Sequence, residues 1–426
     1  MRIGLPIGYL ALGTAGGVET YARNLVKALQ AVDRSNEYCL YCSIANEEAF
    51  PATAENFKKV ISGKWKQIEL VRLKAVAAAD GIIQSGGKSV FMKTLRSVTE
   101  FATRGAKVLR GLAIDSTGGS QQHDIIHYMF NVFPHEKHHD ALVVLTIADI
   151  QQEYFPQFFS KESLEQRRCT YRISAEKSNH IIAISEFTKK SLVELYGISE
   201  AKISVTHLGY NDKVFKTISG PEVGEFRARR RLPSKFMLYP AATWPHKNHV
   251  NLVRAYKIMK ERFGFDEKLI FTGIKKQSHS AVAKEIERLG LKDDIIHIGY
   301  LPYEDLPLLY NAASLLVFPS LFEGFGMPVV EAMGVGLPVA CSNTTSLPEV
   351  AGGAAILFDP EDPEDIAEKV AALLNDKALK KTLVQKGLAR ASMFTWEQTA
   401  LKTKKVYEDV YADFRKDTAG SKLELP

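Results

Sequence analysis

The segment 315–350 constrains the fold of this chain most, because it joins a buried strand, a glycine-rich loop and a helix. Four apolar residues, Leu315–Phe318, precede Pro319, which is typical of a parallel strand that stops at the carboxyl edge of a sheet. Gly324 and Gly326 allow a sharp turn, and a proline at position 328 suits the first turn of a helix over 328–333. Unpaired amides at such a helix start favour an anion. The segment therefore predicts a site for a negatively charged group.

Two carboxylates lie in and just after the glycine-rich loop of this segment. Glu323 follows the strand, and Glu331 lies one turn into the predicted helix among apolar neighbours. A carboxylate in such surroundings costs free energy unless another group hydrogen-bonds it, which favours a role in binding. The alternative is that Glu331 only complements the helix dipole, which contributes about 0.3–1 kcal/mol, and that Glu323 is a solvated loop residue. The residues taken singly leave both interpretations open.

Length and composition indicate a soluble globular protein of two domains. The chain has 426 residues, of which 46% are hydrophobic and 24% charged. Single hydrophobic cores stop growing at roughly 250–300 residues, so we expect two domains of similar size. No apolar run approaches the ~20 residues that a membrane-spanning helix needs. Pro6 and Gly8 interrupt the apolar start, which argues against a signal peptide.

The cysteines favour a reducing compartment, and we expect a cytoplasmic protein. Cys39 and Cys42 have the spacing of a redox motif, but they lie in a strand-like run without the turn that such a motif needs. We interpret them as thiols of the core.

The N-terminal segment predicts the start of a doubly wound α/β domain. A strand over 2–9 leads through a glycine-rich loop over 13–17 into an amphipathic helix. The pair Gly16 and Gly17 allows the backbone to approach a ligand, and the helix start behind it suits a phosphate. Further strands are predicted at 37–44, 67–72, 125–129, 141–147, 181–184, 203–207, 236–240, 268–272 and 295–298, with helices in most gaps and at 363–375, 377–391 and 396–414.

Residues 64–113 carry the charge of the protein. They contain ten basic and three acidic side chains, a net charge of +7, whereas the whole chain has +6. A helix within this segment would have one apolar and one basic face, which can lie on an anionic membrane or hold an acidic ligand. The alternative is a surface helix with a solvated basic face. We expect no nucleic-acid partner, because no recognised nucleic-acid module accompanies the charge.

A histidine-rich region follows. Its spacing offers no second ligand pair of the kind that zinc sites use, so we expect no metal. His127 closes a strand and is either an acceptor-side residue or an imidazole of the core. The members of the region are His123, His127, His135, His138 and His139.

Glu323 and Glu331 form a more specific pattern when they are considered together. They are separated by seven residues that include Gly-Phe-Gly-Met-Pro, and Leu347-Pro-Glu-Val350 and a Gly-Gly pair follow. This pattern resembles the signature of retaining family 4 glycosyltransferases, also called glycosyltransferase group 1, which have the GT-B fold. The resemblance implies that Glu323 meets hydroxyls of a donor sugar and that Glu331 binds the ribose of its nucleotide. Backbone amides of the loop, contributed by Gly324, Phe325, Gly326 and Met327, would face the donor.

The resemblance extends to three other loops. The loop 241–248 contains Thr243, His246 and Lys247, and in the family a lysine here holds the donor diphosphate, usually with an arginine nearby. That arginine is missing, so His246 or backbone amides would replace it; the alternative for Lys247 is a solvated loop cation. Tyr300 and Leu301 resemble the loop that surrounds the nucleotide base. The family also has a Gly-Gly loop between acceptor and diphosphate, which corresponds to Gly16 and Gly17.

The sequence departs from the family in the segment 146–149. The family commonly has His-Asp there, and the histidine contacts the donor sugar, whereas this chain has Ala148 before Asp149. Either another side chain makes the contact, or the histidine has been replaced in this sequence, or catalysis does not need it. We keep Asp149 as a catalytic candidate with Glu323 and Lys247.

The resemblance implies two doubly wound Rossmann-like domains that face a cleft. We expect an acceptor-binding domain over 1–215 with the basic insertion, a linker over 209–234, a donor-binding domain over 216–395, and a helix from 396 that crosses back to the first domain, followed by a tail. The implied activity is retaining transfer of a hexose, from a donor such as GDP-mannose or UDP-glucose, to a hydroxyl of a glycan or lipid-linked acceptor.

The lysine and the amides can carry the charge of the diphosphate, so we expect no cofactor and no obligatory metal. Two alternatives remain. One is a non-catalytic or inactivated protein that binds sugar nucleotides or glycans, and the other is a nucleotide-sugar 2-epimerase of the same fold. The basic insertion would place the protein on the inner face of a membrane.

Overall fold

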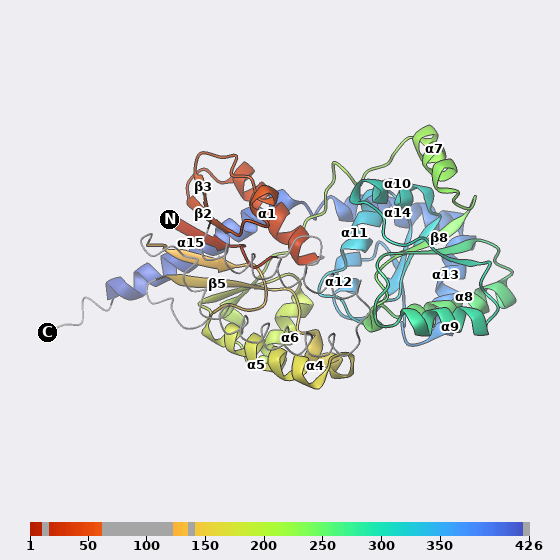
Figure 1. The fold of residues 1–426 in the computed structure, drawn as a ribbon, viewed down its shortest axis with the longest axis horizontal. Helices are drawn as coiled ribbons and strands as arrows, with labels where there is room; N and C mark the ends of the chain where they lie inside the picture. Colours follow the sequence, from red (N-terminus) through yellow and green to blue (C-terminus); the bar gives the residue numbers. More distant parts are fainter. Residues whose placement is uncertain (11–16, 62–121, 135–140, 421–426) are drawn as a thin grey trace, which may run out of the picture.

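The computed structural model describes residues 1–10, 17–61, 122–134 and 141–420. Two parallel sheets lie side by side, each with helices on its faces (Figure 1). We call the part around the first sheet the N-terminal half and the part around the second sheet the C-terminal half. This architecture confirms the predicted pair of doubly wound Rossmann-like units. The boundaries placed at 215 and 395 stay predictions.

The first sheet has seven parallel strands in the order β3-β2-β1-β4-β5-β6-β7. Most were predicted to within three residues. The predicted strand 67–72 lies outside the described residues, as does the basic segment 64–113, and the strand at 57–61 was not predicted. The strands are β1 Arg2–Pro6, β2 Glu37–Cys42, β3 Phe57–Ile61, β4 Ile125–Tyr128, β5 Leu142–Ile147, β6 His180–Ala183 and β7 Ile203–Val205.

The second sheet has six parallel strands in the order β10-β9-β8-β11-β12-β13. The sequence predicted four of them, but β12 and β13 were missed because their apolar runs are short and lie among glycines and prolines. In this order β8 and β11 are neighbours, so the loops that follow them start at adjacent points of one sheet edge. The strands are β8 Phe236–Pro240, β9 Lys268–Thr272, β10 Ile295–His297, β11 Leu315–Phe318, β12 Val339–Ser342 and β13 Ile356–Phe358.

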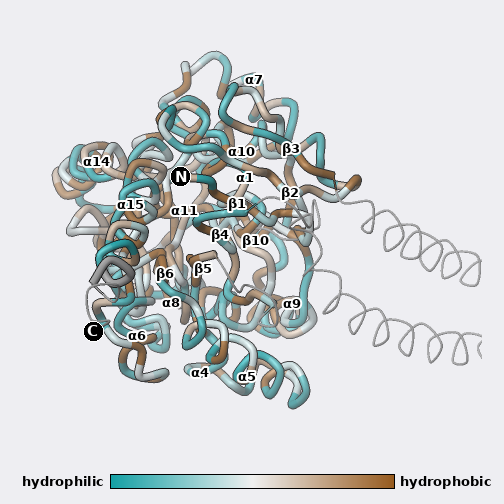
Figure 2. The backbone as a smooth tube through the Cα atoms, turned by 90° about the vertical axis from the view of Figure 1, so that its left-hand side faces the viewer, coloured by the Kyte–Doolittle hydropathy of each residue, from teal (hydrophilic) through white to brown (hydrophobic). Residues whose placement is uncertain are grey.

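Short and long helices connect the strands of the N-terminal half. The helix α5 has both hydrophilic and hydrophobic residues along its length (Figure 2), and its buried residues are Tyr171, Ser174 and Ala175. The α-helices are α1 Gly17–Val32, α4 Gln151–Tyr154, α5 Lys161–Lys177 and α6 Glu186–Tyr196, and the 3-10 turns are η1 Glu47–Ala49, η3 Pro156–Phe158 and η4 Glu200–Lys202.

The predicted linker 209–234 was partly wrong, because it contains the helix α7, Gly220–Arg230. This helix packs on α10 of the C-terminal half, and its basic end pairs with Asp305 at 3.3 Å from Arg229. The other elements of this half are η5 Pro245–Lys247, α8 His249–Phe263, α9 His279–Arg288, η6 Tyr303–Asp305, α10 Leu306–Ala312, α11 Met327–Gly334, α12 Leu347–Ala351, α13 Pro363–Asn375 and α14 Lys377–Ala391.

The last helix, α15 (Trp396–Gly420), returns to the N-terminal half and packs against α1 (Figure 1), as predicted. Gly209 makes this return possible, because a Cβ there would lie 2.2 Å from the backbone nitrogen of Trp396. Lys404 of α15 lies 3.5 Å from the buried carboxylate of Asp33. The two ends of the chain therefore share one packed unit.

The strands supply the core of both halves. Residues of β5 and β11 are buried along their whole length, as parallel strands covered on both faces require. The side chains of Cys39 and Cys42 are buried in β2, which confirms that they belong to the core. Among the described residues, no helix is both long and apolar enough to cross a membrane.

Candidate active site

The predicted strand, loop and helix form as expected at the carboxyl end of β11. Gly326 has φ +104°, and a Cβ there would lie 2.6 Å from the Leu347 side chain, so only glycine fits the turn. The helix α11 starts at Met327, with Pro328 in its first turn. Phe325 is buried and contacts the rings of His207 and Phe394, so its side chain secures the loop rather than reaching a ligand.

Glu323 and Lys247 meet at the edge of the second sheet. The Lys247 Nζ lies 2.5 Å from the Glu323 Oε1, and the two side chains are only 18% and 13% exposed. The backbone N–H of Leu321 donates to the carbonyl of His246 at 2.8 Å, which joins the loops that follow β8 and β11. The two residues are 76 positions apart in the sequence. The family resemblance assigned both to one site, and the structure brings them into direct contact.

Glu331 has a different environment. It lies beyond the first turn of α11, so the interpretation that it complements the helix dipole is not supported. The Tyr310 hydroxyl donates to its Oε2 at 3.0 Å, which is the hydrogen bond that a carboxylate in an apolar element needs. Burial raises the pKa of Glu331 to about 7. One glutamate of the pair is therefore matched by a cation and the other by a neutral hydroxyl.

In the loop 241–248, the candidate residues Thr243 and His246 have different environments. Thr243 is fully buried, and its Oγ1 accepts the backbone N–H of Lys276 at 2.7 Å, so it fixes the loop after β9. Burial, with a smaller contribution from the Lys247 charge, lowers the pKa of His246 to about 3. His246 is therefore neutral at pH 7 and does not supply the charge of the missing arginine, which leaves the backbone amides as the other expected substitute.

Of the two residues predicted to surround the nucleotide base, only one has an exposed side chain. Tyr300 is 70% exposed, whereas Leu301 is buried. The backbone N–H of Gly273 donates to the carbonyl of Gly299 at 2.8 Å, which places this loop beside the loop that follows β9. A ligand at this edge would meet the Tyr300 ring and the loop backbone rather than the Leu301 side chain.

The N-terminal half contributes Ala148 and Asp149 to the same place. A Cβ on Gly324 would lie 2.4 Å from the carbonyl oxygen of Ala148 and 3.2 Å from the Asp149 Cβ, so the glycine loop packs directly on this segment. Burial raises the pKa of Asp149, and the nearby Glu323 charge adds to that rise. The structure thus brings Asp149, Glu323 and Lys247 together.

The acceptor-side prediction for His127 is wrong. The residue is fully buried in β4, with its Nδ1 2.7 Å from the Tyr407 hydroxyl and its Nε2 2.7 Å from the Thr146 hydroxyl. Both ring nitrogens are therefore used inside the core, which matches the alternative of a core imidazole. Gly17 opens α1, and a Cβ there would meet nothing within 4 Å, whereas Gly16 lies outside the described residues.

Sequence reasoning missed four residues that hold the glutamates. One is Tyr310, and the others are three consecutive hydroxyl residues that contact the loop 321–325. Their only signal in the sequence is the run Thr-Thr-Ser before Leu347. Thr345 has φ +57°, which is rare for a β-branched residue, and its Oγ1 accepts the Glu323 N–H at 3.2 Å. The described residues contain no cluster of three or more side chains that could hold a metal ion.

Comparisons with known proteins agree with this geometry. A family model described as Glycosyltransferase Family 4 matches residues 15–214, and one described as Glycosyl transferases group 1 matches residues 225–390. O-antigen chain mannosyltransferase B of Escherichia coli is 30% identical over 265 residues, which are 62% of this chain and 70% of that protein. Mannosylfructose-phosphate synthase of Agrobacterium fabrum is 27% identical over 56% of this chain and 54% of its own length.

Solved structures share the fold over nearly the whole chain. Sucrose-phosphate synthase from Thermosynechococcus elongatus has a TM-score of 0.68 at 20% identity, over 97% of this chain and 100% of the other. Anabaena HepE in complex with UDP and glucose has a TM-score of 0.65 at 17% identity, over 96% of this chain and 100% of the other. With two family models covering most of the sequence and the paired glutamates in place at the second sheet, the chain belongs to the family 4, group 1 glycosyltransferases of the GT-B fold.

Proposed function

We propose that the protein is a retaining hexosyltransferase that uses a nucleoside diphosphate sugar and glycosylates a hydroxyl of a glycan or lipid-linked acceptor. The observation that carries the proposal is the contact between Lys247 and Glu323, 2.5 Å apart at the start of the α11 loop. A pair with little exposure to solvent combines a cation for a leaving diphosphate with a carboxylate for sugar hydroxyls.

Each member of the pair has its own task. When a donor binds, its diphosphate takes the Lys247 ammonium as counter-ion, and the Glu323 carboxylate then accepts hydrogen bonds from the sugar. The amides at the start of α11 add positive potential next to the same phosphates. Positive charge grows on the sugar in the transition state, and the carboxylates of Glu323 and Asp149 favour it. Glu331, beside Tyr310, accepts from the ribose hydroxyls.

In the retaining step that we propose, the acceptor attacks the face from which the diphosphate leaves. The bond between the anomeric carbon and the phosphate oxygen breaks, and its electron pair goes to that oxygen. The acceptor oxygen bonds to the anomeric carbon on the same face, and its proton passes to the departing phosphate. No carboxylate need act as general base, and a metal is not required to offset the charge that Lys247 and the amides meet.

Relatives favour mannose as the sugar. The mannosyltransferase names of the Escherichia coli relative and of others at 26–31% identity support GDP-mannose, whereas the UDP and glucose in the Anabaena structure keep UDP-glucose open. Thermal unfolding with GDP-mannose, UDP-glucose, GDP and UDP separates these donors, because a ligand at ~100 times its Kd adds about 2.7 kcal/mol of stability. Product formation, with and without EDTA, then tests turnover and the metal-free reaction. Stabilisation by none of the four would count against the proposal.

Ala148 supports a second candidate, a protein that binds the donor without transferring it. The family histidine that contacts the donor sugar is absent, and the backbone of Ala148 is instead fixed by Asn131 and Thr188. Donor binding without turnover, restored by Ala148→His, would establish this candidate. Turnover by the natural sequence would exclude it.

A further inference from the structure

The segment 344–346, directly before α12, contacts the loop around Glu323 through three hydroxyls. The Ser346 hydroxyl, at the start of α12, donates to the carbonyls of Glu323 at 2.9 Å and Phe325 at 3.0 Å. Thr345 accepts the Glu323 N–H, and the Thr344 hydroxyl donates to the Leu321 carbonyl at 3.4 Å. The main chain on both sides of the Glu323 side chain is therefore held by the segment 344–346.

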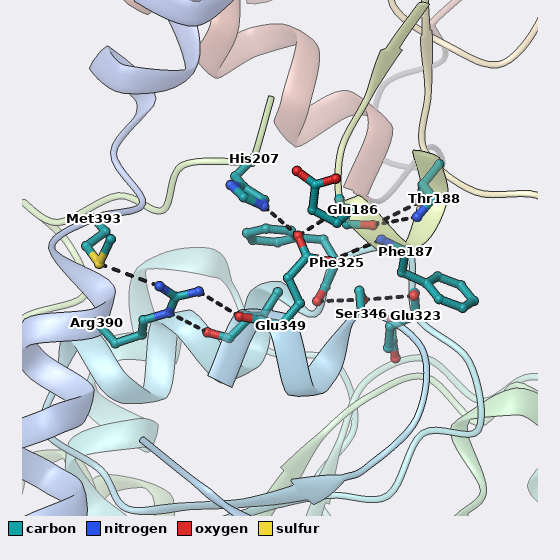
Figure 3. A network of polar contacts seen from close by, with 12 residues as sticks. Glu186, Phe187, Thr188, His207, Glu323, Phe325, Ser346, Glu349, Arg390 and Met393 are labelled. Atoms are coloured by element: carbon teal, nitrogen blue, oxygen red, sulfur yellow. Dashed lines mark hydrogen bonds and ion pairs between the residues drawn. The ribbon is translucent and has the colours of Figure 1, made fainter. Parts of the chain in front are cut away.

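One turn after Ser346, Glu349 reaches the other half of the protein. Its Oε1 accepts the backbone N–H of Glu186 at 2.9 Å, and its Oε2 accepts that of Phe187 at 3.2 Å. These are the first two residues of α6. The His207 Nε2, 2.6 Å away, donates to the same carboxylate (Figure 3). One side chain of the C-terminal half thus satisfies three donors of the N-terminal half.

The carboxylate is held in its ionised form. Burial raises the pKa of Glu349, but hydrogen bonds from His207 and from the two backbone amides outweigh burial and keep the pKa below its ordinary value. The opposite end of α12 is also fixed, because the Arg390 guanidinium donates to the carbonyls of Glu349 at 2.6 Å and Val350 at 3.0 Å (Figure 3). Polar contacts therefore hold α12 on the side of α6 and on the side of Arg390.

Aromatic rings also pack between the loop around Glu323 and the start of α6. Phe322, directly before Glu323, is 2% exposed, and its ring centroid lies 5.7 Å from that of Phe187 and 5.4 Å from that of Tyr154. The start of α6 therefore receives both a carboxylate and an aromatic ring from the C-terminal half. The ring of Phe322 directly precedes Glu323, and the carboxylate of Glu349 follows the hydroxyl of Ser346 by three residues.

We propose that Glu349 is a positioning residue that docks α12 on the start of α6 and so sets Glu323 against the segment 148–149. This inference rests on the proposed function, since it assigns the alignment of Glu323 for transfer. The strained backbone of Thr345 fits this role, because its conformation directs the hydroxyl at the Glu323 amide. The Glu349 carboxylate is occupied by the α6 amides and His207, so it would act through the helix and the loop.

The test compares Glu349→Gln and Glu349→Ala with the control Glu364→Gln. Glu364 pairs with Arg262, and both residues belong to the C-terminal half. We expect both Glu349 variants to lower kcat on the order of 10²-fold, because a misplacement of about 1 Å can cost that much. Nucleotide affinity, measured by calorimetry with GDP and UDP, should change less than about threefold, because the donor loops belong to the C-terminal half. The control should match the natural protein.

Small-angle scattering gives a readout that does not depend on activity. Without the carboxylate, Glu349→Ala should show a larger radius of gyration than the natural protein and Glu364→Gln. If neither GDP-mannose nor UDP-glucose is turned over by the natural protein, the proposed transfer fails, while scattering still tests the docking. An unchanged scattering curve, or a Glu349→Gln variant with natural kcat per folded molecule, would overturn the inference.

Discussion

The carboxyl edges of the two sheets use their polar side chains in opposite ways. At the second sheet, Lys247 and Glu323 have each other as partner and stay partly exposed where the two halves meet. At the first sheet, His127 and Thr146 are buried and bonded to groups of the interior. The second edge thus offers a charged pair to a ligand, whereas the first edge adds the Asp149 carboxyl and keeps His127 and Thr146 in the interior. The comparison supports the proposal that the donor binds mainly to the C-terminal half.

The interior network of the N-terminal half explains why its polar residues are not available. The Thr146 hydroxyl lies 3.0 Å from the Tyr21 hydroxyl as well as 2.7 Å from His127, and His127 reaches Tyr407 of α15. Burial lowers the pKa of His127 to about 3, so the ring is neutral at pH 7. The network joins β4, β5, α1 and the returning helix, and its role is to hold these elements together.

The largest expected effect follows from separating the charged pair of the second edge. Glu323→Ala and Lys247→Ala should each lower kcat/KM by at least ~10²-fold, about 2.7 kcal/mol, because each removes charge that faces the reacting groups. The matched control is Lys292→Ala, which breaks an exposed pair with Glu287 in the same half and should leave kcat/KM unchanged. Steady-state kinetics on folded variants makes the measurement. Natural rates in either site variant would mean that the pair is not the catalytic centre.

A smaller effect concerns the protonation of Glu331, the second glutamate. Since Glu331 has a pKa of about 7, only about a tenth is ionised at pH 6 and about nine-tenths at pH 8. The ionised form accepts from ribose hydroxyls, so affinity for a nucleotide sugar should rise as much as about tenfold over this range. Glu331→Gln should remove the rise, which calorimetry at the two pH values measures.

Stability should change in the opposite direction with pH. The folded protein keeps a proton on Glu331 that the unfolded chain loses above its ordinary pKa of 4.5, so the free energy of unfolding falls as pH rises from 5 to 8. Glu331→Gln should therefore unfold at a higher temperature than the natural protein at pH 8 and at a similar one at pH 5. The same pH dependence in both proteins would show that Glu331 titrates at its ordinary pKa.

The sequence predicted what depends on local pattern. Strand β8 and the turn before α11 follow from apolar runs, from glycines and from Pro328, and the structure has them where predicted. The resemblance placed Lys247 and Glu323 in one site, and they meet because β8 and β11 are neighbouring strands. Local patterning located the strand ends, and the resemblance selected the side chains.

The sequence could not predict what depends on packing between distant segments. His127 ends a strand in either interpretation, and only the return of α15 over the first sheet, which brings Tyr407 to its Nδ1, decides between them. Glu349 is a helix residue like others until α6, 163 positions away, presents two amides to it. Such contacts have no period or spacing along the chain, so pattern analysis does not reach them.

The smallest expected effect on catalysis is at the first edge. Tyr407→Phe removes the hydroxyl bonded to His127 and leaves a buried ring nitrogen without its partner, which should cost about 1–3 kcal/mol of stability. Denaturant unfolding measures this loss, while kcat/KM should stay within about twofold because the network does not face the donor. Natural stability combined with a large loss of kcat/KM would place the His127 network in the reaction and would remove the contrast between it and the charged pair of the second edge.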